Sequence, residues 1–171
     1  MTACQKTESL DPASGDTQIT VKASFPAQMA ETRAAGDGTT VDRCIMQIYL
    51  DGELYGERQV AAVENLSATF SVRLVAGKTF DLVFWADKSG ADINSDLHYN
   101  TADLANVAFT GDYIGNDDAR DAFFGTAQVL SDKSQAVNVE LKRPFGQLNV
   151  KTLDLAEVKA ASPVSYTHLT L

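Results

Sequence analysis

The chain has 171 residues, which is enough for one domain of ordinary size with a single core. Hydrophobic residues make up 44% and charged residues 22%, as in soluble globular proteins, and no apolar run is long enough to cross a bilayer. The net charge of −9 disfavours nucleic acid and anionic lipid surfaces as partners, since no basic stripe offsets it. The two cysteines and two histidines give neither a disulfide framework nor zinc-ligand spacing, so we expect no cofactor and no metal.

Residues 1–16 have the pattern of a lipoprotein N-terminus followed by a tether. Cys4 follows the small residues Thr2 and Ala3, which resembles the site where a signal peptidase cuts and the thiol takes a lipid. The basic and apolar stretch of a signal peptide is missing before it, so we expect the frame to start at the end of the signal. Residues 5–16 are polar and turn-rich, as flexible tethers are. An ordinary cysteine in a polar tail is the alternative interpretation.

Period-two alternation of apolar and polar side chains begins after the tether and predicts an all-β chain. The first strand is expected from Thr17 to Phe25, and Pro26 ends it. Asp51-Gly52 and Ala76-Gly77-Lys78 are turn signals that predict hairpins. Further strands are expected over residues 44–50, 68–74, 80–86, 104–109, 126–130, 137–141 and 148–150.

Two stretches break the alternation. Residues 87–103 are acidic and rich in Asn and Ser, which predicts a long surface loop. Residues 116–125 begin with Asn and Asp and end with Gly, which predicts one short helix near 117–124. Seven or more short strands predict two antiparallel sheets packed face to face as a β-sandwich. Its expected core holds Cys44 as an unreactive thiol, with Phe70, Val72, Phe80, Leu82, Phe84, Val137 and Val139.

Four segments together resemble the fimbrillin-like surface lipoproteins of Bacteroidetes. They are VDRCIMQIYL (41–50), FWAD (84–87), NDDARDAFF (116–124) and LKRPFGQL (141–148). The resemblance implies two β-sandwich domains of transthyretin-like Greek-key topology, joined by a segment like Arg143-Pro144-Phe145-Gly146. Residues 17–145 would then be the N-terminal β-sandwich domain, and residues 146–163 the start of a truncated second domain.

The last residues have a different origin in our interpretation. The run VSYTHL (164–169) resembles the conceptual translation of a transposon-end sequencing adapter. Residues 164–171 are therefore expected to be an adapter-derived artefact and are excluded from fold reasoning. A genuine polar strand is the alternative.

The family resemblance also implies a function. Fimbrillin-like subunits reach the outer membrane as lipoproteins, a trypsin-like protease cuts shaft subunits after an arginine, and a partner's strand fills the place of the removed first strand. Arg33 resembles that cleavage site, since it lies in a small-residue loop after the first strand, although a solvated loop arginine is the alternative. The chain would be a structural or adhesive subunit of a cell-surface fimbria, with other fimbrial subunits and a host glycan or protein as partners.

A second interpretation makes the chain a monomeric surface lipoprotein that binds glycan or peptide through loops 87–103 and 110–118. Trp85, on the outward face of its strand, could form an aromatic platform with Tyr99 and Tyr113, unless a loop or the next domain covers it. Residues 92–103 partly match a calcium-loop register, but Leu97 replaces its glycine, so a solvated acidic loop is favoured. No Ser-His-Asp set can be assembled, and we do not expect an enzyme.

Overall fold

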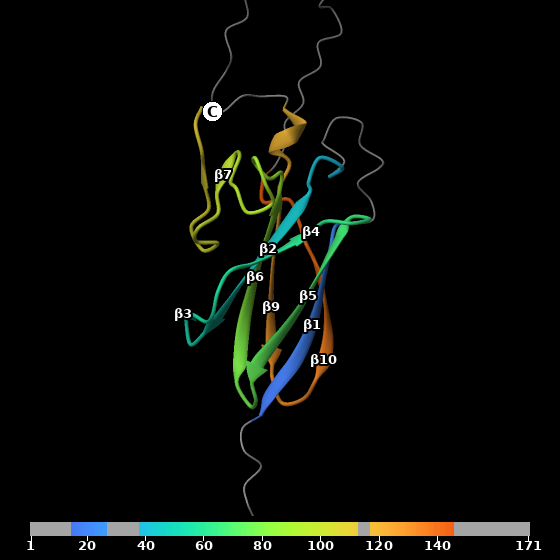
Figure 1. Ribbon diagram of the computed structural model, residues 1–171, viewed down its shortest axis with the longest axis vertical. Coiled ribbons are helices and arrows are strands. Elements are labelled where there is room, and N and C mark those ends of the chain that lie inside the picture. The colour runs from blue at the N-terminus through green and yellow to red at the C-terminus, as the bar shows by residue number, and fades with distance from the viewer. Residues whose placement is uncertain (1–14, 27–37, 113–116, 146–171) are drawn as a thin grey trace, which may run out of the picture.

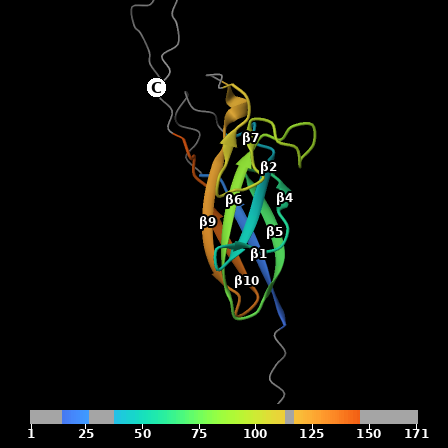
Figure 2. The ribbon, with the colours of Figure 1, turned by 90° about the vertical axis from the view of Figure 1, so that its left-hand side faces the viewer.

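The computed structural model describes residues 15–26, 38–112 and 117–145, and in these residues the protein is all-β. Two sheets pack face to face, as predicted (Figure 1, Figure 2). The three-stranded sheet has the order β10-β1-β5, with β10 at Gln135–Glu140, β1 at Asp16–Ser24 and β5 at Ser67–Val75. The five-stranded sheet has the order β3-β2-β6-β9, and β4 also pairs with β2. Its strands are β2 Arg43–Leu50, β3 Glu53–Leu54, β4 Gln59–Ala62, β6 Thr79–Asp87 and β9 Phe123–Leu130.

The two-sheet core confirms most of the expected faces. Phe80, Leu82 and Phe84 on β6 are fully buried. Between them Asp81 is exposed and Val83 is only partly buried, as the alternation predicts, whereas Trp85 after Phe84 is buried as well. Val137 is the exception, because it lies on the edge strand β10 and is only partly buried. Cys44 lies in the same core at 0% exposure, and burial raises the pKa of its thiol to about 12, as expected of an unreactive cysteine.

The first hairpin also follows the sequence signal. Asp51 and Gly52 have φ of 53° and 83°, and Leu50 pairs with Glu53 across the turn. Two consecutive residues with positive φ are what a tight hairpin turn requires, and an Asp-Gly pair adopts them readily.

One strand pair corrects the antiparallel prediction. β1 runs parallel to β10, with Ile19 opposite Gln135 and Ser24 opposite Glu140, while it is antiparallel to β5. Alternation shows which face of a strand is buried, but it carries no information on the direction of its neighbour. β10 reaches the three-stranded sheet by crossing over from β9 in the other sheet, and this crossover brings it alongside β1 in the same direction.

The helix expected near 117–124 is present only as one short turn. Asp117 accepts a hydrogen bond from Ala119 N as an N-cap should, but only a 3-10 turn follows, η2 at Asp118–Arg120. The chain is already in β9 at Phe123, which is fully buried against the core. Pairing of β9 with β6 therefore overrides the weak local helix signal.

The outer face of the five-stranded sheet is covered by a third layer, formed by residues 88–112 and 117–122. This layer contains a small hairpin of β7 Tyr99–Asn100 and β8 Ala108–Phe109. Of the strand expected at 104–109, only β8 is present. A second apolar cluster lies under it and comprises Ile45, Trp85, Tyr99, Leu104 and Ala122. The strand expected at 148–150 lies outside the described residues. Within the described ranges, no helix is long and apolar enough to span a membrane.

Candidate functional site

The most unusual feature of the fold is the position of β1. It is the central strand of its sheet and pairs with β5 on one side over nine residues and with β10 on the other over six. Its inward side chains Ile19, Val21 and Ala23 are all at 0% exposure. Without β1, the sandwich would expose an apolar groove with two unpaired strand edges, which is the geometry that accepts an added strand.

Both ends of β1 are fastened to other parts of the sandwich. At its start, Thr17 Oγ1 donates to Ser131 O at 3.1 Å. At its end, Ser24 O accepts from Leu141 N at 2.8 Å, and Phe25 N donates to Leu66 O at 3.0 Å. The start of β1 lies at one end of the sandwich and its end points toward the end at which β7 lies (Figure 1).

Three residues singled out from the sequence lie outside the described residues. They are Cys4, the expected lipid site, Arg33, the expected cleavage site, and Tyr113, one ring of the expected aromatic platform. In sequence, Arg33 falls between β1 and β2, so a cut after it would separate β1 from the remainder of the chain.

The structure corrects the expectation that Trp85 and Tyr99 form an open platform. Trp85 does face outward from its strand, but it is only 3% exposed, because the third layer covers it. Tyr99 belongs to that layer and is only 2% exposed, because it packs into the same cluster. The two rings meet edge to face, with centroids 5.1 Å apart. Trp85 Nε1 donates to Asp87 Oδ2, and Tyr99 OH donates to Arg120 O, so their polar atoms are engaged within the protein. Neither ring is available to stack on a sugar or peptide in this structure.

Two half-exposed rings take that place at the surface. Phe109 is 47% exposed and Phe145 is 48% exposed, and they stack with centroids 5.4 Å apart. Phe145 also lies against Tyr99 and Trp85, at 6.2 Å and 6.4 Å between centroids. No signal in the sequence predicts this pair, since Phe109 and Phe145 are 36 positions apart and neither lies in a pattern that marks a surface ring.

The third layer is held to the sheet by a buried charge network that the sequence did not reveal. Arg43 and Asp87 face each other on β2 and β6, and both side chains are at 0% exposure. Arg43 Nε donates to Asp87 Oδ1 at 2.6 Å, and Nη2 donates to Asp96 Oδ1 at 2.9 Å. Arg43 Nη1 donates to the carbonyls of Ile93 and Ser95, which fixes the loop backbone. Through these contacts the network fastens residues 93–96 to the five-stranded sheet.

The pKa values in this network reflect burial opposed by pairing. Burial raises the pKa of the Asp87 carboxyl, and the hydrogen bond and charge of Arg43 work against that rise. For Arg43, burial lowers the pKa, but Asp87 and Asp96 together outweigh it and raise the pKa above its ordinary value. For Asp96, burial raises the pKa, but hydrogen bonds from Thr101 and Arg43 outweigh it and the net direction is down.

The acidic loop does not converge into a cation site. Asp92 accepts hydrogen bonds from Ser95 Oγ and Asn94 N, which lower its pKa. Asp103 accepts hydrogen bonds from the Asn106 side chain and Ala105 N, which lower the pKa of Asp103 in the same way. Asp96 faces Arg43. Among the residues that the structure describes, no group of three His, Cys, Asp or Glu side chains could hold a metal ion.

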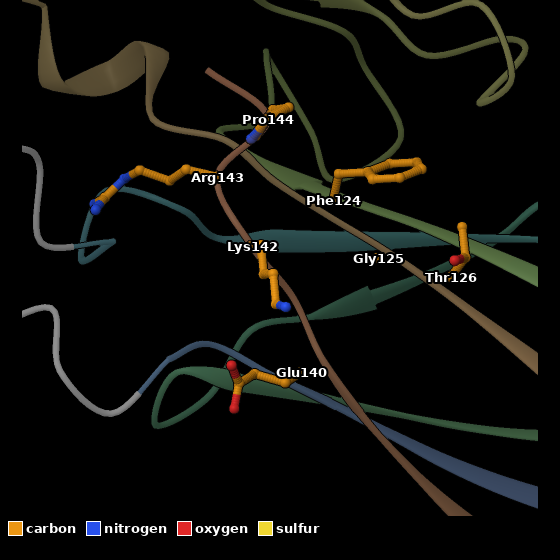
Figure 3. Close-up of a pocket in the computed structure, with 7 residues that line it drawn as sticks. All are labelled: Phe124, Gly125, Thr126, Glu140, Lys142, Arg143 and Pro144. Atoms are coloured by element: carbon orange, nitrogen blue, oxygen red, sulfur yellow. The ribbon is translucent and has the colours of Figure 1, made fainter. Parts of the chain in front are cut away.

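A shallow pocket of about 290 Å³ lies where β9 meets the segment after β10 (Figure 3). Phe124 and Lys142, which line it, exchange two backbone hydrogen bonds of 2.8 Å. Gly125 leaves room for Leu141 there, because a Cβ at this position would be 2.6 Å from Leu141 Cδ2 and would force that side chain to shift. The lining is Phe124, Gly125, Thr126, Glu140, Lys142, Arg143 and Pro144. The lining is mixed, since charged Glu140, Lys142 and Arg143 lie beside apolar Phe124 and Pro144.

The fold and these contacts define a β-sandwich domain whose first strand is buried and is paired with a neighbour on each edge. The sequence model of a family of unknown function, DUF6562, matches residues 11–170, and the chain belongs to this family. No curated protein matches the chain.

Two solved structures resemble this one. A crystal structure of a DUF1812 protein from Bacteroides thetaiotaomicron, for which polysaccharide binding has been suggested, matches with a TM-score of 0.51 at 15% identity, over 74% of this chain and 47% of that one. A fimbrial assembly protein from Parabacteroides distasonis matches with a TM-score of 0.42 at 15% identity, over 75% of this chain and 52% of that one. The chain thus spans about half the length of both, and the first likeness establishes a shared fold.

Proposed function

We propose that the protein is a structural or adhesive subunit of a cell-surface fimbria, assembled by strand exchange at the β1 position. The observation that carries the proposal is the central place of β1 between β5 and β10, with Ile19, Val21 and Ala23 fully buried. A strand in this place can be replaced by another strand of the same pattern, since the backbone pairing on either side is independent of sequence.

Cleavage after Arg33 is the step that would make β1 replaceable. As long as β1 is covalently linked to β2, its effective concentration at the groove is far above that of a strand from another subunit. A cut in the connection between Ser24 and Arg43 removes this advantage, so that a strand on a second subunit can compete. Arg33 is the one arginine in that connection, and it suits a trypsin-like protease.

We also infer that the protein is a lipoprotein of the outer membrane, anchored through Cys4, and that it is not an enzyme. Other fimbrial subunits are its proposed partners. The resemblance of residues 41–50, 84–87, 116–124 and 141–148 to fimbrillin-like proteins supports this inference. The shared fold with a protein from Bacteroides agrees with it.

A second candidate function is favoured by a separate observation. Phe109 and Phe145 form a stacked, half-exposed pair, and aromatic surfaces of this kind bind the apolar faces of sugars. The DUF1812 protein of the same fold is one for which polysaccharide binding has been suggested. The chain would then be a monomeric surface lipoprotein that binds glycan or peptide at this end of the sandwich.

One experiment separates the two functions. The full-length protein and its Arg33→Ala variant are treated with trace trypsin, and their molecular masses are followed by light scattering, with the first cut mapped by mass spectrometry. The fimbrial proposal expects cleavage first after Arg33, followed by oligomers, while the Arg33→Ala variant stays monomeric. Oligomers that form equally well from the uncut variant would contradict it. Glycan binding by the monomeric variant that is lost in Phe109→Ala would favour the second function.

A further inference from the structure

The end of β1 touches the other sheet through two stacked aromatic rings. Phe25 directly follows β1 and is 7% exposed, and Phe123 is the first residue of β9 and is fully buried. Their ring centroids are 4.3 Å apart and the ring planes differ by 12°, which is a close parallel stack. The last inward position of the first strand is therefore in direct contact with the five-stranded sheet.

Phe123 supports an arginine of the segment that leaves the sandwich. The guanidinium carbon of Arg143 is 5.0 Å from the centroid of the Phe123 ring, within the range of a cation–π contact. Arg143 Nε and Nη2 donate to the two carboxylate oxygens of Asp121, at 2.8 Å each, and the Asp121 side chain is only 7% exposed. Asp121 Oδ2 also accepts from Gly38 N at 3.1 Å. A bidentate pair of this kind fixes the orientation of Arg143.

We call residues 141–145 the exit segment, because the chain leaves the described sandwich through them. Three contacts besides the Arg143 pair hold it. Leu141 N donates to Ser24 O on β1, Lys142 exchanges two hydrogen bonds with Phe124, and Phe145 packs on Tyr99 and Phe109. Two of the supports of the exit segment thus depend on β1, one through Ser24 and one through Phe25 and Phe123.

We propose that Phe25 couples the strand in the β1 position to the exit segment, so that an aromatic ring at this position is needed to hold residues 141–145 in place. The backbone bond from Leu141 can be made by any strand in that place. The ring stack cannot be made by every strand, because it needs a planar side chain between β1 and Phe123. An aliphatic residue would fill part of the space but would leave Phe123, and with it Arg143, free to shift.

The coupling specifies which strand would suit the β1 position, and this part rests on the proposed function. Such a strand carries Ile, Val and Ala at alternate inward positions, as at residues 19, 21 and 23, followed by an aromatic residue at the fourth. It runs parallel to β10 and antiparallel to β5. A strand with an aliphatic fourth residue would bind in the groove without holding residues 141–145 in place.

The first test uses the intact chain and does not depend on strand exchange. Phe25→Leu is compared with Ile19→Val, a matched apolar change near the other end of the same strand. Hydrogen exchange is measured at the Phe124 and Lys142 amides and normalised to the amides of β6, which removes any change in global stability. The emission of Trp85, the single tryptophan, reports separately on its contact with Phe145.

We expect the normalised exchange at Phe124 and Lys142 to rise about tenfold in Phe25→Leu, with a shift of the Trp85 emission, and to be unchanged in Ile19→Val. The Phe25→Tyr variant keeps a ring and should behave as the unsubstituted protein. Equal normalised exchange in Phe25→Leu and Ile19→Val would overturn the coupling, whether or not strands exchange.

The second test separates the coupling from the proposed function. Trypsin-cut protein is mixed with a peptide of residues 15–26 or with the same peptide carrying Leu at position 25. The coupling predicts that both peptides bind but that only the Phe peptide protects the Phe124 and Lys142 amides. Equal protection by both would refute the coupling. If neither peptide binds, strand exchange is refuted, and the test on the intact chain alone decides whether the coupling is correct.

Discussion

Gly125→Ala tests the packing between β9 and the exit segment, because two effects predict opposite signs for it. Glycine inside a strand has an entropic cost, so alanine would ordinarily stabilise the protein by about 0.5–1 kcal/mol. Here the added Cβ would lie 2.6 Å from Leu141 Cδ2 and 3.4 Å from Val139 Cγ1. Leu141 is fully buried, so its side chain has little room to move. Overpacking of this kind costs about 1–3 kcal/mol, so we expect a net loss of about 1–2 kcal/mol.

Urea unfolding followed by Trp85 fluorescence measures this loss, with Thr126→Ala on the exposed side of β9 as the matched control. Leu141→Ala alone should cost about 2–5 kcal/mol through the cavity it leaves. Adding Gly125→Ala to Leu141→Ala should then cost nothing further, since the clashing atom is gone, and the cycle should show a coupling of at least about 1 kcal/mol. A Gly125→Ala variant that is more stable than the unsubstituted protein would refute the packing described here.

Three further predictions concern the core and the anchor. Phe84→Ala removes a fully buried ring beside Phe70 and should lower the free energy of unfolding by about 3–5 kcal/mol. Arg73→Ala on the exposed face of β5 should lower it by less than about 0.5 kcal/mol. Similar losses for the two variants in urea unfolding would show that the strand faces are assigned in the wrong register. In a Cys4→Ser background, the Cys44 thiol should resist a thiol reagent at neutral pH until the protein unfolds. Burial raises the pKa of the thiol from 9.0 to about 12, so its contribution to stability is present below pH 9 and lost between pH 9 and 12. Cys44→Ala should therefore remove this contribution from the slope of the free energy of unfolding against pH. An identical slope in the variant would argue against a buried thiol. Cells that express the full-length precursor and are fed labelled palmitate should label the protein, and label that persists in Cys4→Ser would exclude Cys4 as the lipid site.

The strands with one solvated face could be predicted closely from sequence. β5 alternates between exposed and buried residues along almost its whole length, because one face meets the core and the other meets water. The inward-facing residues of β2 were also predicted correctly. Its outward residues Arg43 and Gln47 are buried as well, since the third layer covers that face, and alternation gives no sign of such a layer.

The interaction sites depend on contacts between residues far apart in the sequence, which explains why they were harder to predict. Arg43 and Asp87 are paired by the register of β2 and β6, and no local pattern marks that register. Trp85 was correctly placed facing outward, but the covering segment is irregular and has no period to reveal where it packs. The ion pair of Asp121 and Arg143 likewise joins residues 22 positions apart and depends on the crossover from β9 to β10.

Exchange of β1 is the central claim, and uptake of a labelled strand measures it most directly. A fluorescent peptide of residues 15–26 is added to trypsin-cut protein, to uncut protein and to uncut Arg33→Ala protein, and its anisotropy is followed over time. A matched peptide with Asp in place of Val21 serves as control, because it would bury a charge at a fully buried position. We expect uptake of the unsubstituted peptide by the cut protein alone. Uptake at the same rate by the Arg33→Ala protein, or equal uptake of the Asp-containing peptide, would contradict it.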